Sequence, residues 1–123
     1  MDSSKYFSKA ELQCKCGCEA ALMDAQFIMM LELLREKFNK PLLVSSGYRC
    51  PKHNNNVSGT GIAGPHTTGK AIDLKVDRGA AYELLKIAMD MGFSGIGVNQ
   101  KGNARFMHLD TINTGLRPTI WSY

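Results

Sequence analysis

Residues 66–76 read HTTGKAIDLKV, and the rest of the sequence can be interpreted outward from this stretch. Its second half, residues 71–76, alternates apolar and polar side chains, a pattern that predicts a half-buried strand. Because successive side chains of a strand point to opposite sides, Asp73 would face away from the core. The apolar face would consist of Ile72, Leu74 and Val76. His66 stands just before this strand, at the end of a glycine-rich segment.

A second strand with the same alternation is predicted over residues 105–110, which read RFMHLD. Met107 and Leu109 would face the core, and His108 and Asp110 would share the opposite face. Residues two apart on a strand are separated by roughly 6.5–7 Å. His108 could therefore bind a metal ion while Asp110 reaches a water molecule on that ion.

Two histidines and one aspartate form the candidate metal site: His66, Asp73 and His108. Catalytic zinc takes three protein ligands, imidazole nitrogens or carboxylate oxygens, and keeps one position open for water. Zinc would lower the pKa of that water toward about 7, and Asp110 is our candidate for the base that takes its proton. In the alternative interpretation, Asp110 is a carboxylate that orients a zinc-bound histidine.

The flanking segments predict two helices and two further strands. Asp24 is a candidate N-cap for a helix that runs to about Asn39 and is stopped by Pro41. One apolar stripe of this helix would consist of Phe27, Met30, Leu31, Leu34 and Phe38. The second helix is expected over residues 78–91, with Gly92 as its C-terminal stop. The additional strands are expected over residues 42–46 and 94–99.

Three segments lack a regular pattern. Residues 1–23 are expected to be irregular, and residues 47–69 to form a long functional loop. The tail, residues 111–123, ends in Trp121 and Tyr123, which we expect to pack back on the body of the protein. The length of 123 residues indicates one domain. The predicted fold class is α+β, with a small, mostly antiparallel sheet packed against two helices.

Four segments then resemble the zinc D-Ala-D-Ala carboxypeptidase and endolysin peptidase family: SGYRCP at 46–51, HN at 53–54, HTTGKAID at 66–73 and FMHLD at 106–110. The family motifs run S-G-Y-R, H-x-x-G-x-A-x-D and H-x-D, and the wider superfamily includes lysostaphin-type peptidases and the hedgehog signalling domain. The resemblance covers residues 10–121 and implies a hedgehog/DD-peptidase-like fold. It also implies a zinc peptidase that cuts D-amino-acid-containing peptide bonds of bacterial peptidoglycan, as a carboxypeptidase or as an endopeptidase.

The resemblance assigns roles to individual residues. His66, Asp73 and His108 match the three zinc ligands, and Arg49 matches an arginine that faces the active site and helps to bind substrate. A guanidinium can donate two parallel hydrogen bonds to a carboxylate, although an arginine that braces the loop is the alternative. His53 is a candidate substrate-binding residue, or a structural residue of the loop. Many relatives carry an acid three residues before the last zinc histidine, where this chain has Arg105.

Four cysteines are present, at positions 14, 16, 18 and 50. They could hold a second, structural zinc ion, but the C-x-C-x-C spacing is not the usual C-x₂-C pair. In a reducing cytoplasm free thiols are the default, and we expect them here. A disulfide to Cys50 is the alternative if the protein acts outside the cell.

The composition bears on partners and location. The net charge of +4 would suit an anionic partner such as a cell wall, but no run of Lys and Arg indicates nucleic-acid binding. No apolar stretch could cross a membrane, and the polar start MDSSK is not a secretory signal. We expect a monomer, made in the cytoplasm, that acts on peptidoglycan stem peptides after release, as an endolysin does.

Two alternatives to a free peptidase stay open. The hedgehog branch indicates that this fold can keep zinc as a non-catalytic binding module. A virion-associated component that degrades the wall would use the same chemistry within a structural assembly.

Overall fold

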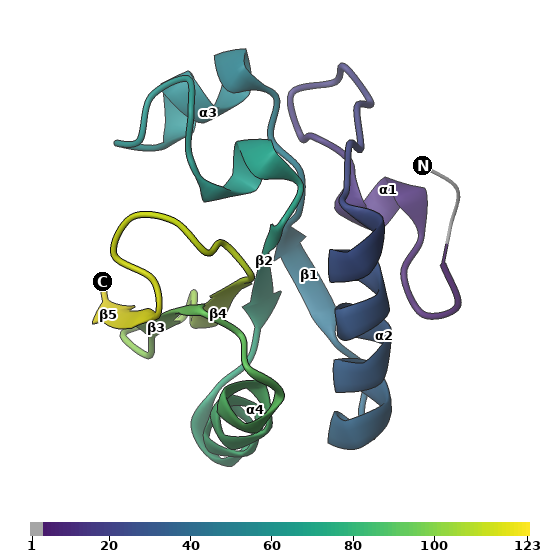
Figure 1. Ribbon diagram of the computed structural model, residues 1–123, viewed down its shortest axis with the longest axis vertical. Coiled ribbons are helices and arrows are strands. Elements are labelled where there is room, and N and C mark those ends of the chain that lie inside the picture. The colour runs from purple at the N-terminus through teal and green to yellow at the C-terminus, as the bar shows by residue number, and fades with distance from the viewer. Residues whose placement is uncertain (1–3) are drawn as a thin grey trace.

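A five-stranded sheet runs through the computed structural model, which describes residues 4–123 (Figure 1). Its strand order is β1-β2-β4-β3-β5. The strands are β1 (Leu43–Ser46), β2 (Ala71–Lys75), β3 (Gly95–Asn99), β4 (Phe106–Asp110) and β5 (Thr119–Ser122). The first four pair antiparallel, and β5 pairs parallel with β3. The predicted α+β class with a mostly antiparallel sheet is confirmed.

The two long helices lie where the apolar periodicity predicts them. They are α2 (Ala25–Phe38) and α4 (Arg78–Met91). The Asp24 side chain accepts a hydrogen bond from the Phe27 N–H, which satisfies one of the free donors at the start of α2. Left-handed residues end both helices, Asn39 after α2 and Gly92 after α4.

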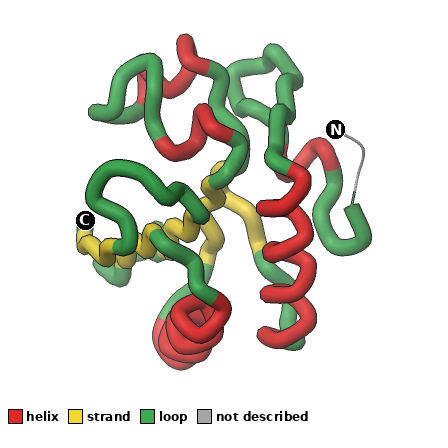
Figure 2. The backbone as a smooth tube through the Cα atoms, in the orientation of Figure 1, coloured by secondary structure: helices red, strands yellow, loops and turns green. Residues whose placement is uncertain are grey.

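The main core lies between these helices and one face of the sheet (Figure 2). The apolar stripe of α2 contributes Phe27, Leu31, Leu34 and Phe38, all buried. The predicted inward-facing residues of β2 and β4 meet them: Ile72, Leu74, Met107 and Leu109 are at most 1 % exposed. The other face of the sheet is therefore left to the polar residues that alternate with them.

Three short helices lie in segments for which the sequence predicts irregular structure. They are α1 (Lys9–Leu12), α3 (Pro51–Val57) and the 3-10 helix η1 (Pro65–Thr68). These helices are too short to show an apolar stripe, and residues at their N-termini favour them instead. Ser8 and Glu11 form a capping box on α1, and Pro51 is the first residue of α3. The expected irregularity of residues 47–69 and of residues 4–23 is thus wrong in part; residues 1–3 lie outside the described residues.

The C-terminal tail also differs from expectation, because residues 119–122 form strand β5 rather than an irregular segment. Its register places Ile120 opposite Ile96 and Trp121 opposite Gly97. Trp121 does pack back on the body, as expected, and its ring lies 5.1 Å from that of His108. Among residues 4–123, every helix is too short or too polar to cross a membrane.

Candidate metal centre

The register of two strands brings the first two candidate ligands together. Asp73 on β2 is directly opposite His108 on β4 in an antiparallel pair. Their neighbours on each strand point into the core, so both side chains lie on the face turned away from α2 and α4. The alternation in the sequence is therefore sufficient to place these two residues side by side.

The third candidate ligand, His66, comes from η1, which ends at Gly69. Gly69 has a φ of +75°, and a Cβ there would lie 2.1 Å from the Leu22 carbonyl oxygen. Only glycine combines this left-handed conformation with so close an approach of two backbone segments. The turn at Gly69 leads the chain from His66 directly into β2.

The three side chains converge on one point. Oδ1 of Asp73 lies 3.2 Å from Nε2 of His66 and 3.0 Å from Nδ1 of His108. One ligand atom from each residue lies within 4.8 Å of the others. All three residues are buried, at 5 %, 7 % and 3 % exposure for His66, Asp73 and His108.

The outer nitrogen of each imidazole has a hydrogen-bond acceptor. Nδ1 of His66 lies 2.8 Å from the Gly47 carbonyl oxygen, and Nε2 of His108 lies 2.7 Å from Oδ2 of Asp110. Because a carbonyl and a carboxylate can only accept, both outer nitrogens carry the proton. In neutral imidazoles the lone pairs of His66 Nε2 and His108 Nδ1 then point at Asp73.

This arrangement fits a metal ion. Two nitrogen lone pairs and a carboxylate oxygen face one another at about 3 Å, and they repel unless a cation lies among them. Two imidazoles and one carboxylate are a zinc ligand set, and acceptors on the outer nitrogens are the usual support for metal-binding histidines. Although burial acts to raise the pKa of Asp73, His108 and His66 would hold that pKa below the ordinary value if their imidazoles were protonated.

Asp110 lies behind His108 and has no exposed surface. Besides the contact with His108, its two oxygens accept hydrogen bonds from Nε and Nη2 of Arg117, at 3.1 and 2.8 Å. Burial acts to raise the pKa of Asp110, but His108 and Arg117 lower it to about 2. Gly95 leaves room for the carboxylate, because a Cβ there would lie 2.2 Å from Oδ1 of Asp110.

The ligand set opens into a cleft of about 650 Å³. Two arginines reach it: Arg117, and Arg49, whose Nη2 lies 3.6 Å from Oδ2 of Asp73. Hydrogen bonds to Ser46 and Asn54 hold the Arg49 guanidinium. Asp73 is the only acidic residue that lines the cleft in the described part of the chain. The wall also includes Val57, Pro65, Phe106, Trp121 and Tyr123.

His53 is not brought to the cleft. It lies half-buried in the first turn of α3, where its backbone N–H donates to Cys50 Sγ. The neighbouring Asn54 is the residue that supports the site: it is 1 % exposed and bonds Arg49, Thr60 and the Gly61 carbonyl.

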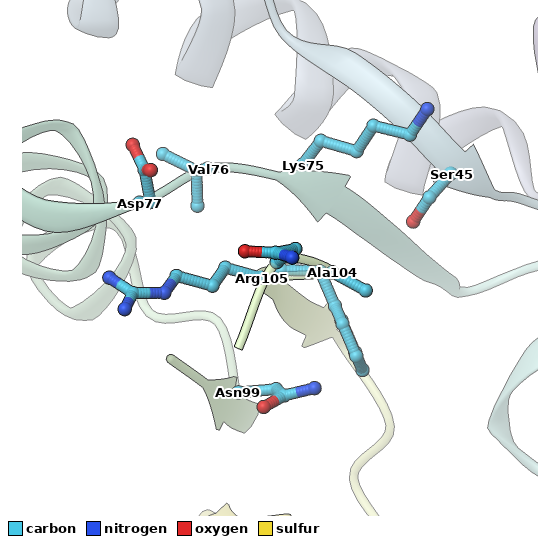
Figure 3. Close-up of a pocket in the computed structure, with 9 residues that line it drawn as sticks. Ser45, Lys75, Val76, Asp77, Asn99, Ala104 and Arg105 are labelled. Atoms are coloured by element: carbon cyan, nitrogen blue, oxygen red, sulfur yellow. The ribbon is translucent and has the colours of Figure 1, made fainter. Parts of the chain in front are cut away.

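A second cavity, also of about 650 Å³, lies at the other end of β2 and β4 (Figure 3). Arg105 lines it, and its Nε donates to the Gly102 carbonyl oxygen. This cavity contains none of the three candidate ligands, so we place the functional site in the cleft beside His66, Asp73 and His108.

Two contacts of the site, those of Arg117 and of the Gly47 carbonyl, were not expected from the sequence. A backbone acceptor leaves no trace in the side-chain pattern. Arg117 precedes β5 in a tail without periodicity, and only its charge beside the aromatic Trp121 could have marked it. Its guanidinium lies 5.0 Å from the centre of the Trp121 ring.

Residues 5–110 match the model of the family described as Peptidase M15. The matched range includes all three candidate ligands, Arg49 and Asp110. No curated protein matches the chain.

Proposed function

The chain belongs to the peptidase M15 family, and we propose that it is a zinc peptidase that hydrolyses D-amino-acid-containing peptide bonds of bacterial peptidoglycan. The observation that carries the proposal is the convergence of His66 Nε2, Asp73 Oδ1 and His108 Nδ1 at the edge of an open cleft. The family match supports a metallopeptidase, and the ligand geometry supports the site.

The three ligands would hold one zinc ion. Zinc bound there would lower the pKa of a bound water toward about 7 and polarise the carbonyl of the scissile bond. The Gly47 carbonyl and Asp110 keep both imidazole rings in the tautomer that presents a lone pair inward. Burial of the ligands limits their motion and excludes water from all but the cleft side.

The charge of the cleft supports an anionic substrate. Arg49 and Arg117 balance the charges of Asp73 and of the buried Asp110, and a bound zinc ion would add a positive excess. Stem peptides of peptidoglycan end in carboxylates, which a guanidinium binds well. We propose that Arg49 orients the substrate, because its fork faces the ligand set and is held by Ser46 and Asn54.

For Asp110 we propose the orienting role rather than proton transfer. Its two oxygens already accept hydrogen bonds from His108 and Arg117, and it has no exposed surface from which to reach a substrate. A carboxylate in this position fixes the ring of a metal-binding histidine and raises its basicity.

One observation favours a second candidate, a non-catalytic zinc-containing binding module. Among the described residues that line the cleft, Asp73 is the only acidic one, and it is a proposed metal ligand. None of these residues is therefore a free carboxylate that could serve as the base. Such a module would hold zinc and bind wall fragments without cutting them.

Defined substrates test the proposal and the type of cleavage. Zinc-loaded protein is incubated with a linear stem peptide ending in D-Ala-D-Ala and, separately, with a cross-linked dimer of stem peptides. Release of free D-alanine indicates a carboxypeptidase, and resolution of the dimer indicates an endopeptidase. Asp73→Ala serves as the control without a complete ligand set. Neither product, with one zinc ion still bound by the three ligands and with measurable peptide binding, supports the binding module instead.

A further inference from the structure

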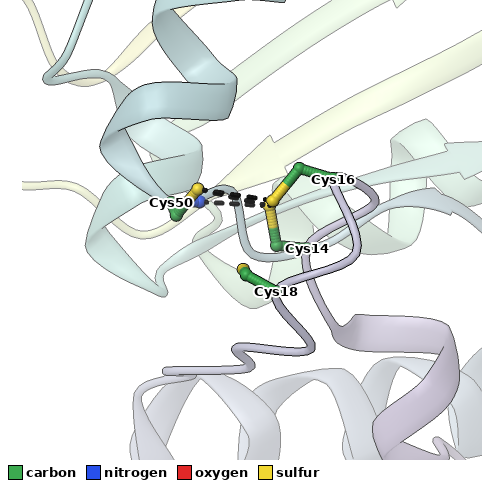
Figure 4. Close-up of side chains that lie close together, drawn as sticks. All are labelled: Cys14, Cys16, Cys18 and Cys50. Carbon is green, nitrogen blue, oxygen red and sulfur yellow. Dashed lines mark hydrogen bonds between the residues drawn. The ribbon is translucent and has the colours of Figure 1, made fainter.

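The four cysteine side chains meet beside the start of α3 (Figure 4). Cys14, Cys16 and Cys18 belong to the loop that follows α1, and Cys50 immediately precedes α3. Cys14 Sγ lies 3.5 Å from Cys16 Sγ and 3.7 Å from Cys50 Sγ, and Cys16 Sγ lies 3.7 Å from Cys50 Sγ. All four sulfurs lie within 4.8 Å of one another.

We propose that Cys14, Cys16, Cys18 and Cys50 bind a second zinc ion with a structural role. Zinc–sulfur bonds of about 2.3 Å at tetrahedral angles separate the sulfurs by about 3.8 Å, close to the three distances here. A disulfide would need sulfurs about 2.05 Å apart, and all four cysteines are free. The unusual C-x-C-x-C spacing is thus compensated by Cys50, which the fold brings from 32 residues beyond Cys18.

Backbone N–H groups support the sulfurs as thiolates. The Cys50 N–H donates to Cys14 Sγ and the His53 N–H donates to Cys50 Sγ, each at 3.4 Å. The loop that carries the first three cysteines is closed by a hydrogen bond from the Cys14 N–H to the Ala20 carbonyl. Four protein ligands fill a tetrahedral ion, leaving no open position, which is typical of structural zinc.

The proposed ion would join the N-terminal segment to the segment that carries the cleft residues. The Tyr48 N–H donates to the Leu12 carbonyl, and the Arg49 N–H donates to the carbonyl of His66. A Cβ on Gly47 would lie 2.7 Å from the Leu12 carbonyl oxygen, so the two segments touch. Fixing Cys50 would therefore hold Arg49 and the Gly47 carbonyl in place without contact with the substrate.

Zinc content of the full chain tests this inference independently of peptidase activity. Elemental analysis of protein purified under reducing conditions should give two zinc ions per chain. The Cys16→Ser/Cys18→Ser variant, changed at exposed positions only, should retain one. His66→Ala should also retain one, and a chain with all three changes should retain none. Lys15→Ser, an exposed change in the same loop, should keep two.

Two further measurements use the unaltered protein, so the inference does not depend on the folding of a variant. Replacement of zinc by Co²⁺ should give the charge-transfer absorption of a cobalt–thiolate site, and thiol-labelling reagents should react only after chelation. The inference is overturned if the wild type holds a single zinc ion that His66→Ala removes. It is also overturned if its thiols react equally with and without chelator, or if its mass shows disulfides. A loss of peptidase activity alone bears on the proposed function and not on this site.

Discussion

Nε2 of His108 lies 2.7 Å from Oδ2 of Asp110, on the edge of the imidazole opposite to Nδ1, which faces Asp73. The same carboxylate accepts two hydrogen bonds from Arg117. His108 is thus held between two carboxylates, one at the proposed metal position and one behind it.

The first prediction concerns Asp110→Asn. If Asp110 orients His108, the substitution should weaken zinc binding about 10- to 100-fold, while zinc-saturated protein keeps most of its kcat. Competition with a chelator measures the affinity, and peptide hydrolysis at saturating zinc measures kcat. Asp90→Asn, at an exposed position on α4, is the matched control and should change neither. Unchanged zinc affinity with a kcat reduced about 10²- to 10⁴-fold would instead assign proton transfer to Asp110.

The second prediction concerns Gly95→Ala. The added Cβ would lie within 2.4 Å of three carboxyl atoms of Asp110, so the side chain must move. We expect a loss of about 1–3 kcal/mol of stability from overpacking and a reduced zinc affinity, because His108 loses its support. Thermal unfolding and chelator competition measure the two effects. Gly79→Ala, at the second residue of α4 with open space around it, should lower neither the stability nor the zinc affinity. An unchanged zinc affinity in Gly95→Ala would mean that the position of Asp110 does not affect zinc binding by His108.

The third prediction concerns Arg49→Lys, which keeps the positive charge but removes the planar fork. Loss of a charge-assisted hydrogen bond of about 1.5–3 kcal/mol should raise KM roughly 10- to 100-fold. The zinc content should stay the same. Steady-state kinetics on a stem peptide are the measurement. Arg105→Lys, the same change in the other cavity, should leave KM unaltered. If both variants behave alike, Arg49 is a bracing residue of the loop.

The fourth prediction concerns stability in acid. In the folded chain the pKa of Asp110 is about 2, below its ordinary 3.8. Protonation therefore costs the folded state more than the unfolded one, and the carboxylate stabilises the fold by about 2 kcal/mol above pH 4. This contribution should be lost as the pH falls from about 4 toward 2. Chemical unfolding of chelated wild type and Asp110→Asn, compared across that range, measures it. A constant difference between the two chains would contradict the prediction.

The part of the site that could be predicted from the sequence is the part governed by local alternation. Once two strands are recognised by their period of two, Asp73, His108 and Asp110 fall on the polar face, and antiparallel pairing brings them together. The helices α2 and α4 are predictable for the same reason, since an apolar stripe and end signals mark them.

The remaining features depend on contacts between distant segments. Cys50 meets Cys14 across 36 positions, and the sequence could only group the four cysteines without deciding between free thiols, a disulfide and a zinc site. Helix α3 has no apolar stripe that could mark it in the sequence. The buried amide of Asn54 instead ties α3 to the following loop by hydrogen bonds to Thr60 and Gly61. Arg117 reaches Asp110 through a turn without periodicity. The sequence could therefore indicate the ligands and the candidate partner Asp110, but not the contacts made by Arg117, the Gly47 carbonyl and Asn54.

The most direct test of the central claim is mass spectrometry of the fragments that the protein releases from purified peptidoglycan. Zinc-loaded wild type, chelated wild type, chelated wild type with zinc restored, and His66→Ala are compared on the same wall preparation. The account predicts new stem-peptide fragments in the first and third samples and none in the second and fourth. Equal fragments in all four samples would contradict a zinc-dependent mechanism. No fragments from several wall types, despite zinc bound at His66, Asp73 and His108, would contradict the peptidase and leave a binding module.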